Sequence, residues 1–241
     1  MNGAWLAVIL LLVVLLWLVR RIRAMCEAAN EVNWGSSWLN RLDGLNRLFC
    51  RKFHGLPNAA IPLPERGAVL VASNHVSGLD PLLLAAACRR PLRFLIAKEQ
   101  YDRWWLRWLF RATGCIPVER QGNPRAALSA ARRALAAGQV VALFPQGRMH
   151  LDHLPPIPLR RGIVLLSQMS GAPIMPVRIH GVSGQGFTVR AVFMRSRARL
   201  DRRPLLRCHG QTTEWCLAEL SRALHGETSA TTQDRANGTS T

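Results

Sequence analysis

Residues 68–81 read AVLVASNHVSGLDP, and this stretch decides the fold and indicates the chemistry. The apolar run 68–72 is typical of a strand buried on both faces of a sheet. In α/β folds, functional side chains gather at the carboxyl ends of such strands, where His75 and Asp80 follow. A histidine and a carboxylate can form a hydrogen-bonded base and orienting acid. Such a pair can take a proton from a substrate alcohol without a serine of its own.

Asp80 also suits a second interpretation, because it precedes Pro81 and an apolar run typical of a helix. An aspartate at the N-cap, followed by proline at the first helical position, is a common way to begin a helix. Capping the helix and orienting His75 do not exclude each other. The spacing of the two residues is weak evidence by itself, since the chain has seven histidines.

Beyond residue 67, short apolar runs alternate with stretches of helical character. Strands are predicted at 68–72, 93–97, 115–118, 140–144, 173–179 and 187–194. Helices are predicted at 81–88, 101–112, 124–137, 162–170 and 212–224. This alternation predicts an α/β fold, a single domain over 67–225 with a mostly parallel sheet flanked by helices. Residues 226–241 are small and polar, and we expect a disordered tail there.

The N-terminal segment is apolar without interruption over residues 4–19 and then meets Arg20, Arg21 and Arg23. A membrane span needs roughly 20 apolar residues, so this run is slightly short. A secretory signal peptide would carry its positive charge before the apolar run rather than after it. We therefore expect residues 1–23 to form an uncleaved membrane helix, with the catalytic domain on the cytoplasmic face. A re-entrant insertion is the alternative.

The formal charge of +18 comes almost wholly from arginine, because Lys52 and Lys98 are the only lysines. Such an excess suits a phosphate polymer or an anionic membrane surface. The apolar N-terminus favours the membrane, and no helix-turn-helix or zinc-finger spacing favours nucleic acid. We expect an anionic phospholipid membrane as partner and no nucleic acid. The six cysteines lack the paired short spacing of metal ligands, so we expect reduced packing residues and no metal site.

Two further segments combine aromatic and cationic residues. In the segment 24–66, an amphipathic interfacial helix is predicted, followed by a proline-marked linker. Its apolar positions are Trp34, Trp38, Leu42, Leu45, Leu48 and Phe49, and its outward cations are Arg41, Arg47, Arg51 and Lys52. Residues 101–111 likewise place arginines on one helical face and tryptophans on another, as suits a membrane interface. For both segments, ordinary packing against the core is the alternative.

Three later blocks follow the His75 block in a fixed order: GCIPVER at 114–120, FPQGR at 144–148 and APIMPV at 172–177. The four blocks together resemble the ordered sequence blocks of the glycerolipid acyltransferase family, which includes lysophosphatidic acid acyltransferases. The resemblance covers residues 70–181. It implies a glycerol-3-phosphate acyltransferase-like fold. The fourth block could line an acyl channel, and strand packing explains it equally well.

The resemblance implies transfer of a fatty acyl group from a thioester of acyl carrier protein or coenzyme A to a lipid hydroxyl. His75 takes the role of general base, and Asp80 holds its imidazole in the useful tautomer. The imidazolium can then protonate the departing thiolate. No cofactor and no metal is implied. The expected acceptor is a lysophospholipid, with 1-acylglycerol-3-phosphate giving phosphatidic acid as the leading case.

The resemblance also implies residues that bind the acceptor. Arg120 matches the arginine that contacts phosphate, a task that suits the planar donors of guanidinium. Lys98 matches a basic position after the second strand. In the third block, the family pattern Phe-Pro-Glu-Gly-Thr-Arg is altered: Gln146 replaces the glutamate, Gly147 is kept, and Arg148 carries a positive charge one residue early.

The altered third block keeps two alternatives open. One is an acyltransferase that acts on a lyso-lipid with another headgroup, because the glutamine has lost the charge of the carboxylate. The other is a catalytically inactive lipid-binding scaffold of the same fold. The presence of His75, Asp80 and Arg120 argues against the scaffold.

Overall fold

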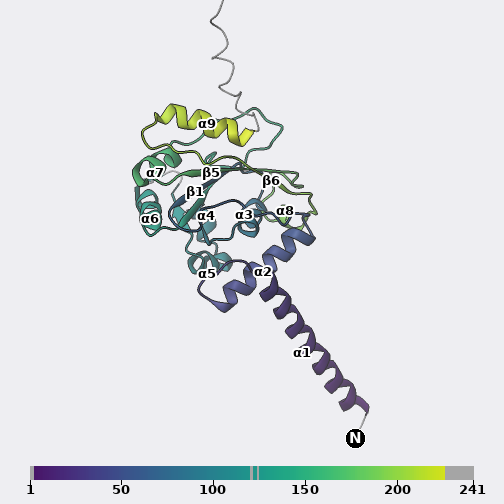
Figure 1. Cartoon of the computed structure of the whole chain (residues 1–241). Coiled ribbons are helices and arrows are strands. Elements are labelled where there is room, and N and C mark those ends of the chain that lie inside the picture. Colours follow the sequence, from purple (N-terminus) through teal and green to yellow (C-terminus); the bar gives the residue numbers. More distant parts are fainter. Residues whose placement is uncertain (1–2, 120–121, 124, 226–241) are drawn as a thin grey trace, which may run out of the picture.

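A computed structural model describes residues 3–119, 122–123 and 125–225 of the chain (Figure 1). It forms an α/β domain around a six-stranded sheet with the strand order β3-β2-β4-β1-β5-β6. The strands are β1 Val69–Ser73, β2 Leu92–Ala97, β3 Ile116–Val118, β4 Val140–Leu143, β5 Ile174–His180 and β6 Arg199–Arg202. All neighbouring strands run parallel except β5 and β6, which are antiparallel. The predicted fold class is confirmed. The expected tail at 226–241 lies outside the described residues.

β1 lies between β4 and β5, and every one of its residues is buried. Because side chains alternate across a strand, Val69 and Val71 enter one core while Leu70 and Ala72 enter the other. Helices therefore cover both faces of β1. This explains why the strand reads as an unbroken apolar run.

The helices divide between the two cores. On one face lie α2 Ser37–Lys52 and α3 Asp80–Ala87. On the other lie α6 Arg125–Ala136, α7 Gly162–Ser170 and α9 Thr213–His225. The helix expected at 101–112 is instead divided into α4 Lys98–Tyr101 and α5 Trp104–Ala112, because the chain turns at Asp102.

The prediction of the sixth strand at residues 187–194 is wrong. Residues 187–194 are not a strand but an exposed loop followed by a short helix, α8 Arg190–Phe193. Gly184 and Gly186 have positive φ angles of 72° and 84°, so the backbone before this segment turns rather than extends. The last strand, β6, is an edge strand rich in arginine, and it offers little apolar signal to a reading of the sequence.

The N-terminal helix α1 Gly3–Ala29 projects from one end of the domain (Figure 1). Within the described residues it is the one helix long and apolar enough to cross a membrane, over Trp5–Ala29. Those 25 residues extend about 37 Å, against roughly 30 Å for the hydrocarbon core of a bilayer. The end of α1 packs tightly on α2, because a Cβ on Gly44 would lie 1.8 Å from the Cys26 carbonyl oxygen.

α2 packs on the core, as the alternative interpretation expected. Its buried positions are Leu39, Asp43, Gly44, Arg47 and Cys50. The expectation that Arg47 points outward is wrong. Its guanidinium is buried, pairs with Asp43 at 2.6 Å, and donates to the carbonyl oxygens of Ala86 and Cys88 at the end of α3. A buried arginine is stable there because it satisfies carbonyl groups that the helix end leaves unpaired.

α5 differs from α2, since each of its residues is at least partly exposed. Trp104, Trp105 and Trp108 are all exposed, and Trp108 contacts Trp38 of α2 at 5.4 Å between ring centroids. Core packing therefore does not account for these tryptophans. Tyr101 and Phe110, by contrast, stack at 5.9 Å and pack against the core.

All six cysteines lie within the described residues, where each is buried and free of a disulfide. Burial raises the pKa of the Cys50 and Cys88 thiols to about 12. The thiols are therefore protonated near neutral pH and act as packing groups.

Candidate active site

The turn between β1 and α3 brings His75 and Asp80 together. The imidazole Nδ1 of His75 lies 2.8 Å from Oδ2 of Asp80. A carboxylate can only accept, so Nδ1 carries the proton and donates it, which leaves Nε2 as the basic nitrogen. The Asp80 side chain is fully buried, whereas 18% of the His75 side chain is exposed. The arrangement therefore holds a proton acceptor at the surface with its orienting acid beneath it.

Asp80 is held by the same turn that it organises. Its Oδ2 also accepts from the backbone N–H groups of Val76 at 2.7 Å and Ser77 at 2.8 Å, and its Oδ1 accepts from Ser77 Oγ at 2.9 Å. All three donors precede α3, so the carboxylate does not cap that helix. The capping interpretation is wrong, although Pro81 does lie in the first turn. Sequence reasoning missed Ser77, whose signal was its position three residues before Asp80.

The loop after β4 contacts the backbone and the imidazole ring of His75. The backbone N–H of His75 donates to Gln146 Oε1 at 2.8 Å, and its carbonyl oxygen accepts from the N–H of His150 at 2.7 Å. The imidazole stacks on Phe144 at 4.1 Å between centroids and 15° between planes. Because β4 pairs with β1, the third sequence block lies directly beside the first. Gln146 thus has a positioning contact that the sequence did not suggest.

Gly147 forms the tight turn that the sequence predicted. Its φ angle is 71°, and a Cβ there would lie 2.2 Å from Arg160 Nε. A side chain at this position would be strained and would displace the guanidinium of Arg160. Arg148, the next residue, is exposed. The turn therefore presents two cations close to the residue that holds His75, and sequence reasoning missed Arg160.

Lys98 has an acidic partner. Its ammonium forms an ion pair with Glu119 at 2.8 Å, and both side chains are about half exposed. The hydrogen bond and charge of Glu119 raise the pKa of Lys98, and Lys98 in turn lowers the pKa of the Glu119 carboxyl. Arg120, the predicted phosphate ligand, follows Glu119 but lies outside the described residues.

Asn74 is a further residue that sequence reasoning missed. Its Oδ1 accepts from the N–H of Ile179 at 2.7 Å, and its Nδ2 donates to the carbonyl oxygen of the same residue at 2.8 Å. This two-bond bridge ties the end of β1 to β5, in the manner of a strand pair. It fixes the backbone immediately before His75.

Comparison with known proteins identifies the family. The sequence model of the family described as Acyltransferase matches residues 52–180, which is more than half of the chain. The chain belongs to the acyltransferase family. The matched region contains all four sequence blocks and the whole His75 turn.

Two relatives are similar to part of the chain. A 1-acyl-sn-glycerol-3-phosphate acyltransferase of Bacillus subtilis (strain 168) is 25% identical over 122 residues, covering 50% of this chain and 60% of the relative. A probable 1-acyl-sn-glycerol-3-phosphate acyltransferase of Mycoplasma pneumoniae is 29% identical over 150 residues, covering 59% of this chain and 53% of the relative. This acyltransferase chain thus spans little more than half the length of these relatives.

A solved structure shares the fold. The crystal structure of the 1-acyl-sn-glycerophosphate (LPA) acyltransferase PlsC from Thermotoga maritima matches with a TM-score of 0.59 and 16% identity. The match covers 79% of this chain and 80% of that chain. The shared architecture agrees with the fold predicted from the four blocks.

The turn of this acyltransferase chain allows a stability prediction. We expect Asp80→Ala to lower the free energy of unfolding by about 2–3 kcal/mol, because three buried donors lose their acceptor. Ser77→Ala removes the bond that Oγ donates to Asp80 and the bond that it accepts from the N–H of Leu79, and should cost about 1–2 kcal/mol. The apparent midpoint of thermal unfolding of the full chain in detergent measures both. Equal midpoints for the two variants would contradict the prediction.

Proposed function

We propose that this chain is a membrane-bound O-acyltransferase that moves a fatty acyl group from a thioester to the hydroxyl of a lysophospholipid. The leading acceptor is 1-acylglycerol-3-phosphate, and the product is then phosphatidic acid. The observation that carries the proposal is the 2.8 Å contact between His75 and Asp80 at the end of β1, in a chain of the acyltransferase family. The names of the two relatives, both 1-acyl-sn-glycerol-3-phosphate acyltransferases, support the choice of acceptor.

The reaction follows from the geometry of His75. Its Nε2 takes the proton of the acceptor hydroxyl, and the oxygen attacks the thioester carbonyl to form a tetrahedral intermediate. The intermediate collapses with cleavage of the carbon–sulfur bond, and the imidazolium returns its proton to the thiolate. Asp80 stabilises the imidazolium formed in between. Protons and electrons balance with these two residues and the two substrates.

The acceptor phosphate would bind to cations around this turn. Arg148 is exposed, and only Gly147 separates it along the chain from Gln146. The Gln146 side chain in turn accepts a hydrogen bond from the backbone N–H of His75. Arg120 fits the same role, although it lies outside the described residues. Lys98 is already paired with Glu119, which offsets its charge and competes with the phosphate for its ammonium. We therefore assign Arg148 and Arg120 to the phosphate ahead of Lys98.

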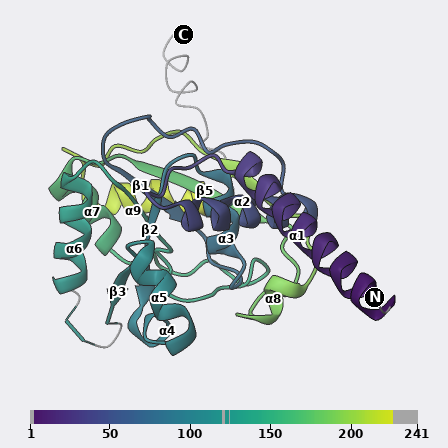
Figure 2. The ribbon, with the colours of Figure 1, turned by 90° about the horizontal axis from the view of Figure 1, so that it is seen from below.

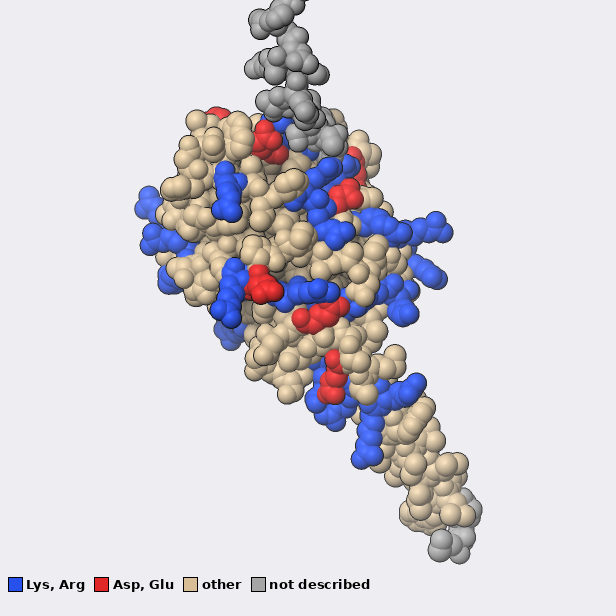
Figure 3. Space-filling model, viewed as in Figure 1, with Lys and Arg blue, Asp and Glu red and all other residues tan. Residues whose placement is uncertain are grey.

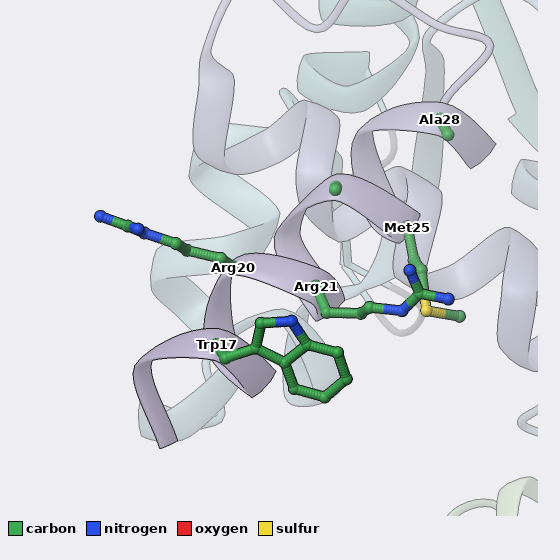
Figure 4. Close-up of a pocket in the computed structure, with 6 residues that line it drawn as sticks. Trp17, Arg20, Arg21, Met25 and Ala28 are labelled. Atoms are coloured by element: carbon green, nitrogen blue, oxygen red, sulfur yellow. The ribbon is translucent and has the colours of Figure 1, made fainter. Parts of the chain in front are cut away.

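The surface supports a membrane location with the domain on the cytoplasmic side. Basic residues far outnumber acidic ones, and several gather where α1 meets the domain (Figure 3). A shallow hollow at that end of α1 is open to the surface (Figure 4). It is lined by Trp17, Arg20, Arg21, Ala24, Met25 and Ala28. Tryptophan and arginine together suit the headgroup layer of an anionic leaflet.

An acyl-transfer assay of the purified full chain tests the function. We expect thioester consumption with 1-acylglycerol-3-phosphate at least about tenfold faster than with a lysolipid that has a zwitterionic headgroup, because one lost charge-assisted contact costs about 1.5–3 kcal/mol. Both donors, acyl carrier protein and coenzyme A thioesters, belong in the assay. Binding of lysolipid without thioester consumption would favour the inactive scaffold. A preference for another headgroup would correct the acceptor alone.

A further inference from the structure

The segment 184–194, here called the lip, lies beside the His75 turn and exposes apolar side chains. Phe187 and Val189 are each 47% exposed, and Phe193 is 73% exposed. Single exposed apolar residues are common on protein surfaces. Three within seven residues concentrate exposed apolar surface in one short segment, and exposed apolar patches mark surfaces that contact other molecules. Residues 187–194 of the lip are the segment that the sequence predicted as a strand.

The lip is hydrogen-bonded to the turn that carries His75. The N–H of Gly78 donates to the carbonyl oxygen of Phe187 at 3.0 Å, and the N–H of Gly186 donates to that of Val76 at 2.8 Å. The contact is close, because a Cβ on Gly78 would lie 2.0 Å from the Thr188 carbonyl oxygen. The exposed apolar side chains are therefore held at a fixed distance from the His75–Asp80 pair.

The lip is also joined to the helix pair that includes the apolar N-terminal helix. His54, just after α2, is buried, and its Nε2 lies 3.1 Å from the carbonyl oxygen of Val192. Burial lowers the pKa of His54, so its ring stays neutral and donates from Nε2 near neutral pH. The rings of Phe49 and Phe53 each form a T-shaped contact with the His54 ring, at 4.8 and 4.9 Å between ring centroids. Since α2 packs on α1, the lip has a defined place relative to α1.

The charge around the lip favours one kind of partner. Arg190, Arg195 and Arg197 are exposed, and the sequence 183–198 contains no acidic residue. The carboxylate of Asp152 accepts from Gln185 of the lip, so three cations face one acid. The Arg190 guanidinium lies 5.0 Å from the centre of the Phe187 ring. Apolar side chains beside arginines match a leaflet of anionic lipid, which attracts cations near its surface.

The position of the lip agrees with this partner. Figure 2 views the domain from the side toward which α1 projects, and no other helix or strand covers α8 or α5 in that view. From these observations we infer that the lip is a second bilayer contact. It places Phe187, Val189 and Phe193 in the anionic leaflet that α1 enters, and it holds the His75 turn at headgroup depth. The bilayer contact does not depend on whether the chain is catalytic. The role of that contact in positioning His75 for its substrate rests on the proposed function.

Site-specific fluorescence tests the contact in the full chain reconstituted into phosphatidylglycerol vesicles. Val189→Cys and, separately, Phe193→Cys are labelled with an environment-sensitive fluorophore. The six native cysteines are buried, which makes the labelling selective. The matched control is Trp215→Cys, a 42% exposed position on α9. Helix α9 lies at the far end of the domain from α1 (Figure 1).

We expect lipid-attached quenchers to reduce the fluorescence at 189 and at 193 at least threefold more than at 215. Equal quenching at all three positions would overturn the inference, and two lip positions guard against a variant that fails to fold. The measurement needs no acyl transfer. Failure of the proposed function and failure of the bilayer contact are therefore separate results.

Discussion

Replacing His75 with alanine should reduce acyl transfer by about 10²–10⁴-fold, the usual contribution of a general base. In the proposed reaction, Nε2 of His75 is the atom that takes the proton from the acceptor hydroxyl, and alanine offers no substitute. The rate of thioester consumption at saturating acceptor measures the effect. Undiminished turnover would remove His75 from the reaction, and with it the mechanism proposed for this chain.

The loss should come from chemistry and not from unfolding. Asp80 keeps three of its four donors in His75→Ala, so the turn retains most of its hydrogen bonds. We expect the thermal midpoint in detergent to fall by only a few degrees. The matched control is His209→Ala, which removes an exposed histidine outside the β1–α3 turn and should retain full activity. If His75→Ala lost both its activity and its fold, the Asp80→Asn variant would serve to separate the loss of catalysis from unfolding.

Much of the fold could be predicted because parallel strands covered on both faces need unbroken apolar runs. β1, β4 and β5 carry that signal, and each begins and ends within about one residue of its predicted bounds. β6 could not be found this way, since an antiparallel edge strand is half solvated and β6 is built largely from charged residues. The apolar residues of the lip gave the signal of a strand, although Phe187, Val189 and Phe193 are exposed.

The residues of the candidate site could be predicted where their contacts join residues that are close in sequence. His75 and Asp80 are five residues apart at a strand end, and that proximity is local. The contacts of Asn74 with Ile179 and of His75 with Gln146 join residues 105 and 71 positions apart. Such contacts depend on which strands are neighbours in the sheet. A single sequence does not state that order.

The burial of Arg47 leads to the largest expected effect on stability. Arg47→Met should lower the free energy of unfolding by about 3–5 kcal/mol, because Asp43 would remain as a buried charge without its partner. The carbonyl oxygens of Ala86 and Cys88 would also lose a donor. For a chain of this size, the loss corresponds to a fall of roughly 6–20 °C in the thermal midpoint.

The control for Arg47 is the exposed ion pair between Arg41 and Glu27, at 2.7 Å. Arg41→Met should cost less than about 1 kcal/mol, since exposed pairs contribute little. The double variant Asp43→Leu with Arg47→Met removes both buried charges and should recover part of the loss. If Arg47→Met were no less stable than Arg41→Met, the buried network would not hold α2 against α3. The link from α1 through α2 to the lip would then need another source of rigidity.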